Sequence, residues 1–271
     1  MSIVVNTNIG SLNAQRSLAE SSRELSTAME RLSSGKKINS AADDAAGFAI
    51  AERMTAQVRG LNMATKNAND GLAMLATIEN ATNDVTDMLQ RIRELAVQAA
   101  NDTNGAQDRT YLQTEVDSLV AEINRVSTDT VYNDSVVLDG NLSGSLQVGT
   151  ASGQTIDFAI TSIDTTTLGV DALDLSDATN AATALTAIDS AIETVAGNRA
   201  GYGALSNRLE YTVSNLMNVA EFTTAARSRI EDADFAAESA RLAKAQVLQQ
   251  TGTAMLAQAN ASSQLAIQLL R

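Results

Sequence analysis

The chain has 271 residues and a net charge of −13, and it contains no proline, cysteine or histidine. Without histidine or cysteine, zinc sites built on imidazole or thiolate are excluded, as are Ser-His-Asp and Cys-His catalytic groups. Apolar residues make up 44% of the chain but aromatic residues only 3%, which favours thin helix packing over one thick core. We therefore expect a structural protein with long helices, no enzyme activity and no cofactor.

Acidic residues are concentrated in the middle of the chain. Residues 129–190 carry nine acidic and no basic side chains, whereas residues 191–271 carry seven of each. An acidic surface excludes nucleic acid as a partner, because phosphate contacts require lysine and arginine. No signal peptide and no apolar run of about 18 residues is present, so we expect no membrane span. An extracellular location would require export without a cleaved signal.

The N-terminal half predicts three helices. The first covers about 11–34, where serine and glycine indicate its end at Gly35. A capping pattern at residues 40–43 opens the second helix, which runs to about residue 100 with a weak point at Gly60. A turn at 101–105 leads into an antiparallel third helix. The predicted heptad stripes of the three helices are Leu18, Ser22, Leu25, Met29 and Leu32; Leu75, Ile78, Thr82, Val85, Leu89, Ile92, Ala96 and Ala99; and Leu112, Val116, Leu119, Ile123 and Val126.

The second half begins with a segment that lacks helical periodicity, residues 129–176. Alternation at 146–148 and 156–160 predicts a β-hairpin, the only strand region we expect. A helix of about 45 residues follows from near Ser176, although three glycines weaken its middle. The last helix covers 235–270.

Together these elements predict a mainly α fold, a long antiparallel helical bundle or coiled-coil rod with both termini helical and paired. We expect residues 1–40 and 235–271 to form a terminal coiled-coil domain. Residues 41–234 would form a rod domain that contains the hairpin region, about 131–175. The apolar residues expected to drive assembly of the terminal helices are Leu18, Leu25, Leu32, Phe235, Leu242, Leu256 and Leu270.

Two motifs that could suggest chemistry have simpler explanations. Asp43 and Asp44 form a carboxylate pair, but a helix N-terminus favours acidic residues there. Residues 34–37 resemble part of a phosphate-binding loop, but the required glycine is replaced by Glu30. Neither motif indicates an active site.

Seven blocks along the sequence follow the pattern of one known protein family. They are residues 31–39, 41–47, 67–71, 90–98, 207–209, 228–234 and 269–271. In these blocks the chain resembles bacterial flagellin, the subunit of the flagellar filament. The likeness covers about 1–140 and 190–271, but the middle is short, as in a minimal flagellin. One departure lies at 131–134, where an aromatic-Asn-Gly turn is more usual.

The resemblance implies self-assembly into the filament for swimming motility, with the terminal helices lining its inner tube. It also implies a secreted, extracellular protein exported unfolded by flagellar type III secretion. Expected partners are other copies, the flagellar cap and hook-associated proteins, and an export chaperone at 235–271. The Toll-like receptor that recognises flagellin is a further expected partner, with Arg91, Leu95 and Glu115 as candidate contacts.

Two other hypotheses stay open from the sequence. A hook–filament junction protein would share the N-terminal likeness, and filament growth beyond a short collar would distinguish the two. A binding module that acts as a receptor ligand or adhesin would never polymerise.

Overall fold

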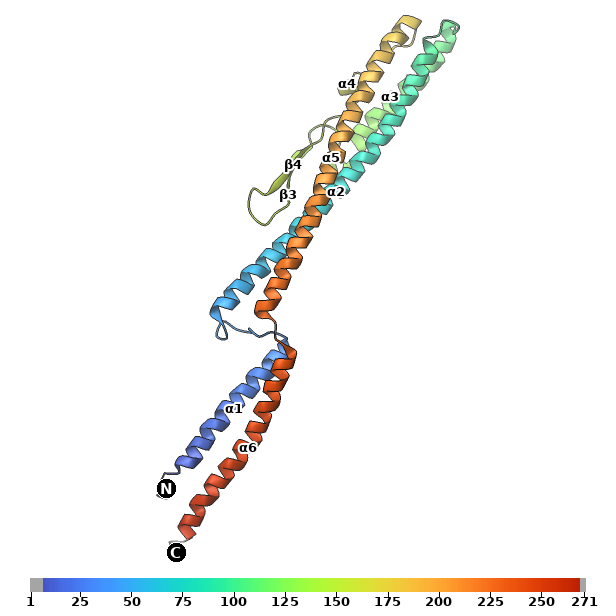
Figure 1. Ribbon diagram of the computed structural model, residues 1–271. Coiled ribbons are helices and arrows are strands. Elements are labelled where there is room, and N and C mark those ends of the chain that lie inside the picture. Colours follow the sequence, from blue (N-terminus) through green and yellow to red (C-terminus); the bar gives the residue numbers. More distant parts are fainter. Residues whose placement is uncertain (1–6, 269–271) are drawn as a thin grey trace. The chain divides into compact units, whose positions relative to one another are not determined.

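The structure is a computed structural model that describes residues 7–268, with side chains described up to Ser262 (Figure 1). It confirms the mainly α fold with a small β region. The chain divides into a terminal unit, which extends to Ala56 and resumes at Phe222, and a central unit, Gln57–Glu221. The elements are α1 (Ile9–Ser34), α2 (Ala45–Ala99), α3 (Ala106–Asp129), β1 (Val131–Tyr132), β2 (Ser135–Val136), β3 (Ser143–Gln147), β4 (Thr155–Ala159), α4 (Thr165–Leu168), α5 (Ala178–Glu231) and α6 (Phe235–Gln268).

The boundaries expected for the terminal domain, after residue 40 and before residue 235, lie in the loop between α1 and α2 and at the start of α6. The division into compact units instead falls inside α2 and α5, so that residues 41–56 and 222–234 belong to the terminal unit. None of the helices in residues 7–268 combines the length and apolar character needed to cross a bilayer.

Backbone hydrogen bonds in the terminal unit hold the loop after α1 against the end of α5. Gly35 ends α1 in the left-handed conformation with φ of 71°, which glycine adopts without steric cost. Its carbonyl accepts a hydrogen bond of 2.9 Å from the Ala233 amide. The amide of Lys37 donates to the Glu231 carbonyl at 2.7 Å. The predicted end of the first helix is thereby confirmed.

The capping pattern at residues 40–43 does not open α2 directly. Asp43 Oδ2 accepts hydrogen bonds from the Asn39 and Ser40 amides, at 3.0 and 2.9 Å. The bond from Ser40 is the main cause that lowers the pKa of Asp43. The pattern thus closes a turn, and the helix begins at Ala45, where Asp44 Oδ1 accepts from the Gly47 amide at 2.9 Å.

The central unit is built on three long helices whose apolar stripes face one another. Arg93 of α2 pairs with Asp189 of α5, and Arg199 of α5 pairs with Glu79 of α2, each at 2.6 Å. This order of contacts makes α2 and α5 antiparallel. Every residue of the stripe predicted for α2 is at most 2% exposed: Leu75, Ile78, Thr82, Val85, Leu89, Ile92, Ala96 and Ala99. The three glycines of α5 do not interrupt its helix.

The predicted hairpin is confirmed as β3 and β4, whose register pairs Leu146 with Ile156. A second hairpin, β1 and β2, overturns the expectation of a single strand region. Its turn residues, Asn133 and Asp134, both have positive φ, 48° and 64°. Asparagine and aspartate tolerate this conformation better than other non-glycine residues, so the departure from the family's usual turn still forms a tight hairpin.

Gly60 has a packing role and does not weaken α2. A Cβ atom at this position would lie 2.8 Å from Thr150 Cγ2 in the loop between β3 and β4. The absence of a side chain therefore lets this loop lie directly on the helix. α2 continues through Gly60 without a break from Ala45 to Ala99.

Candidate assembly interface

The two terminal helices pack along their lengths through regular stripes of buried and half-buried residues. On each helix the residues recur in steps of three and four, the heptad spacing of coiled coils. The stripe of α1 is Ser11, Ala14, Leu18, Ser21, Leu25, Ala28 and Leu32, and that of α6 is Glu238, Leu242, Ala245, Gln249, Gly252, Leu256 and Ala259.

Contacts at both ends make the pair antiparallel. Asn8, just before α1, donates from Nδ2 to the carbonyl of Ala259 at 2.8 Å. At the other end of α1, Arg31 reaches Glu238 in the first turn of α6. Figure 1 shows the two helices side by side, with the chain termini at the same end of the pair.

Small residues occupy three of the four buried positions in the described part of the pair. Ser21, Ala28 and Ala245 are 7%, 3% and 1% exposed, and short side chains let the helix backbones approach closely. The stripe predicted for α1 included Ser22 and Met29. This is wrong, because Ser22 is exposed and Met29 is 54% exposed. At both positions the residue that packs against α6 is the preceding one.

One buried acid joins the helices at the end near α5. Glu238 is 5% exposed, and its Oε1 accepts from Arg31 Nη1 at 3.1 Å and from Arg241 Nη1 at 2.9 Å. A buried carboxylate must be paired to avoid a large desolvation cost. This ion cluster was not predicted from the sequence, although Glu238 lies at heptad spacing from Leu242 and Ala245. Among the residues that the structure describes, no acidic group is arranged to hold a metal ion.

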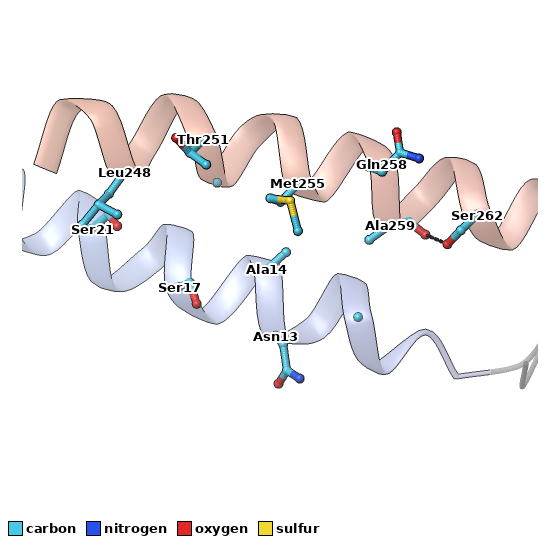
Figure 2. Close-up of a pocket in the computed structure, with 12 residues that line it drawn as sticks. Asn13, Ala14, Ser17, Ser21, Leu248, Thr251, Met255, Gln258, Ala259 and Ser262 are labelled. Carbon is cyan, nitrogen blue, oxygen red and sulfur yellow. Dashed lines mark hydrogen bonds between the residues drawn. The ribbon is translucent and has the colours of Figure 1, made fainter. Parts of the chain in front are cut away.

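A groove of about 500 Å³ lies between α1 and α6 toward the chain termini (Figure 2). Its α6 side is formed by Leu248 and Met255, which remain 41% and 60% exposed. Its α1 side is formed by small residues, including Ala14 and Ser17. The residues that line the groove in this described part of the chain carry no charge: Gly10, Asn13, Ala14, Ser17, Ser21, Leu248, Thr251, Gly252, Met255, Gln258, Ala259 and Ser262.

The predicted assembly residues take different positions in the terminal unit. Most of them contribute to the contact between α1 and α6 and are half-buried there: Leu18, Leu25, Leu32, Leu242 and Leu256. Phe235 is 62% exposed. Phe222, which was not among the predicted residues, is also exposed, at 73%. Leu270 lies outside the described residues. The apolar side chains left exposed within the terminal unit are therefore largely different from those that the sequence indicated.

Two of the three candidate receptor contacts form an exposed ion pair in the central unit. Arg91 Nε donates to Glu115 Oε1 at 2.9 Å, and Arg91 Nη1 donates to Glu94 Oε2 at 3.0 Å. The hydrogen bond to Glu115 is the main cause that raises the pKa of Arg91. Leu95 is 1% exposed and belongs to the core of this unit. Its side chain is not available to a partner while this packing holds.

Comparisons with known proteins match the helical regions at both ends of the chain. The N-terminal helical region of bacterial flagellin matches residues 5–143, and the C-terminal helical region matches 185–270. A flagellin from Halalkalibacterium halodurans is 43% identical over 99% of this chain and 100% of its own length. The flagellar filament 33 kDa core protein of Treponema phagedenis is 39% identical, also over 99% of this chain and 100% of its own.

Solved structures show the same likeness. The crystal structure of Bacillus cereus flagellin matches with a TM-score of 0.50 and 30% identity over 56% of this chain and 88% of that one. A Vibrio parahaemolyticus protein, provisionally named a flagellar hook-associated protein, matches with a TM-score of 0.61 over 70% of this chain and 100% of its own. At 16% identity this second match shows a shared fold alone.

The chain therefore belongs to the bacterial flagellin family, as a minimal member of it. It is a subunit of the flagellar filament, a structural protein and not an enzyme. Relatives that are named as flagellins match it over its full length, which favours the filament subunit over a hook–filament junction protein.

Proposed function

We propose that copies of this chain self-assemble through the paired terminal helices into a filament that drives swimming. The observation that carries the proposal is the uncharged groove between α1 and α6, beside which Leu248 and Met255 stay exposed. Exposed apolar surface of this kind marks an interaction site. A second copy that covered the groove would remove these side chains from water.

The distribution of charge supports the same proposal. Each copy carries a net charge of −13, so copies repel one another at low ionic strength. Residues 129–190 hold nine of the acidic side chains and no basic ones, whereas the groove holds no charge. Assembly through the groove therefore brings no charged groove residue of one copy against another. We expect filament formation to weaken as salt is lowered, and assembly that is insensitive to salt would count against this arrangement.

We propose that residues 1–40 and 235–271 form the inner tube of the filament and residues 41–234 the surrounding rod. In this proposal the subunit is exported unfolded by flagellar type III secretion and acts outside the cell. The absence of proline suits this route, because no slow proline isomerisation delays folding after export. An export chaperone would bind 235–271 beforehand, and cap and hook-associated proteins would contact the filament ends.

Seeded assembly of the purified chain tests the proposal. The full chain and a version that lacks residues 235–271 are mixed separately with short filament seeds, then pelleted and examined by negative-stain electron microscopy. We expect long filaments from the full chain and soluble protein from the shortened one. If the full chain does not extend seeds at any salt concentration, the assembly proposal is wrong. A receptor ligand or adhesin would then be the better explanation.

We also propose that the central unit is recognised by the Toll-like receptor for flagellin, through Arg91 and Glu115. The supporting observation is that these side chains come from different helices, meet at 2.9 Å and are both exposed. A receptor reporter assay with Arg91→Ala and Glu115→Ala should show reduced signalling. Arg93→Ala removes a similar exposed ion pair with Asp189 and serves as the control. Equal signalling by all variants would contradict the proposal.

A further inference from the structure

The turn between α2 and α3 contains a pair of residues with known chemical reactivity. Asn104 and Gly105 form the only Asn–Gly pair in the sequence. In such a pair the backbone nitrogen of glycine can attack the asparagine side-chain carbonyl carbon, because glycine has no side chain to hinder it. Asn104 is half-buried and Gly105 is exposed, and both lie outside the flanking helices.

Hydrogen bonds restrain both reacting groups. The Asn104 carboxamide Nδ2 donates to the Gln98 carbonyl at 2.5 Å, and the Asn104 amide donates to the Asn101 carbonyl at 3.2 Å. The attacking nitrogen, that of Gly105, donates to Asp108 Oδ2 at 3.0 Å. Gly105 is the N-cap of α3 and Asp108 lies in its first turn. Attack requires the backbone nitrogen of Gly105 to lose its amide proton and, with it, the hydrogen bond to Asp108.

We propose that Asn104 is a protected deamidation site, and that Asp108 sets its rate by holding the nitrogen that would attack. In the reaction, Gly105 N bonds to Asn104 Cγ, the Cγ–Nδ2 bond breaks and ammonia leaves. Water then opens the cyclic imide at either carbonyl, which gives aspartate or isoaspartate. The overall change exchanges ammonia for water, and no oxidant or reductant takes part.

Deamidation would alter the turn itself. The new carboxylate cannot donate a hydrogen bond to Gln98 as the carboxamide does. It would also lie within four residues of both Asp102 and Asp108, and like charges repel one another. Isoaspartate additionally lengthens the backbone between α2 and α3. The hydrogen bonds of Asp108 and Gln98 thus protect the connection on which the antiparallel packing of these helices depends.

Peptide mass spectrometry of the intact chain tests the proposal. The purified chain is incubated at mildly alkaline pH, folded or in urea, and is digested only afterwards. Trypsin releases the peptide 94–109, which contains Asn104 and also Asn101, an internal control followed by aspartate. We expect modification at Asn104 alone, about tenfold slower in the folded chain than in urea, which corresponds to about 1.4 kcal/mol.

Variants separate the role of Asp108 from the general stability of α3. Asp108→Ala should raise the folded rate toward the rate in urea, although the bond of Asn104 to the Gln98 carbonyl remains. Asp108→Asn keeps an acceptor oxygen and should stay close to the original. Ala106→Gly weakens the first turn of α3 but leaves the carboxylate in place.

Four results would overturn the proposal. If the folded chain reacts as fast as the chain in urea, or if Asn101 reacts in place of Asn104, the protected site is wrong. If Ala106→Gly accelerates the reaction as much as Asp108→Ala, fraying of α3 sets the rate and Asp108 does not. If Asp108→Ala leaves the folded rate unchanged, the assigned role of Asp108 is likewise wrong.

Discussion

Replacing Glu238 by alanine should loosen the pairing of α1 and α6 more than any exposed charge substitution on these helices. Glu238 bridges the two helices, since it accepts hydrogen bonds from Arg31 of α1 and Arg241 of α6. The Glu238 side chain is 6% exposed and that of Arg31 is 20% exposed. Truncation therefore leaves Arg31 partly buried without its carboxylate.

The expected magnitude follows from the exposure of each pair. A hydrogen bond that involves a charged group contributes about 1.5–3 kcal/mol when it is shielded from water, as the bond to Arg31 is. The Arg241 side chain is 63% exposed, so its pair with Glu238 contributes about 0.5 kcal/mol or less. We therefore expect Glu238→Ala to cost about 2 kcal/mol and Arg241→Ala much less.

Hydrogen–deuterium exchange of the soluble full-length chain measures this cost within the terminal unit. A loss of about 2 kcal/mol should speed amide exchange in α1 and the first half of α6 roughly 30-fold. Glu24→Ala removes an exposed acid from α1 and serves as the matched control. If Glu238→Ala and Glu24→Ala leave exchange equally slow, the ion cluster does not hold the helices together.

Three further outcomes are expected, all measured by urea unfolding. Gly60→Val should destabilise the central unit by about 1–3 kcal/mol, because its Cβ would lie 2.8 Å from Thr150 Cγ2; pairing it with Thr150→Ala should recover part of the loss. Tyr202→Phe should be neutral or stabilise by up to about 1 kcal/mol, since the buried hydroxyl lies near the Thr161 backbone but makes no hydrogen bond of good geometry with the described residues; a clear loss would contradict this. Hydrogen bonds from Thr167 lower the pKa of Asp164 at the start of α4. The stability that this carboxylate contributes is present above its unfolded pKa of about 3.9 and is lost as pH falls through the lower folded value. Asp164→Asn should therefore reduce the fall in the free energy of unfolding at acid pH. An unchanged dependence on pH would contradict this.

The central unit could be predicted closely because its helices are long and each has a regular apolar stripe. In α2 even the one polar stripe residue, Thr82, is fully buried, and its hydroxyl is satisfied by the Ile78 carbonyl at 2.9 Å. Leu95 shows the limit of this approach. It lies outside the single stripe read from the sequence, but it belongs to the same buried core as Val116 of α3 and Ile188 of α5. One sequence stripe does not reveal a second packed face.

The candidate interface was harder to predict because small and polar residues occupy its closest contacts. Heptad spacing selected Ser22 and Met29 on α1, whereas the structure buries Ser21 and Ala28. Which face of a helix admits a close partner depends on both helices, and the sequence of one of them does not contain that information. The second hairpin was not predicted, for a different reason. Strands of two residues, such as β1 and β2, are too short to show alternation of apolar and polar residues.

The proposal that copies of the chain assemble through the uncharged groove can be tested by placing charges beside it. Leu248→Glu combined with Met255→Glu places two charges beside the groove at exposed positions, so the α1–α6 pair itself should persist. Ser152→Glu, in the exposed loop between β3 and β4, is the matched control. In seeded assembly followed by pelleting and electron microscopy, we predict filaments from the original chain and the control and none from the double variant, with equal helix content by circular dichroism. Filaments of normal length from the double variant would contradict the proposal that copies join through this groove.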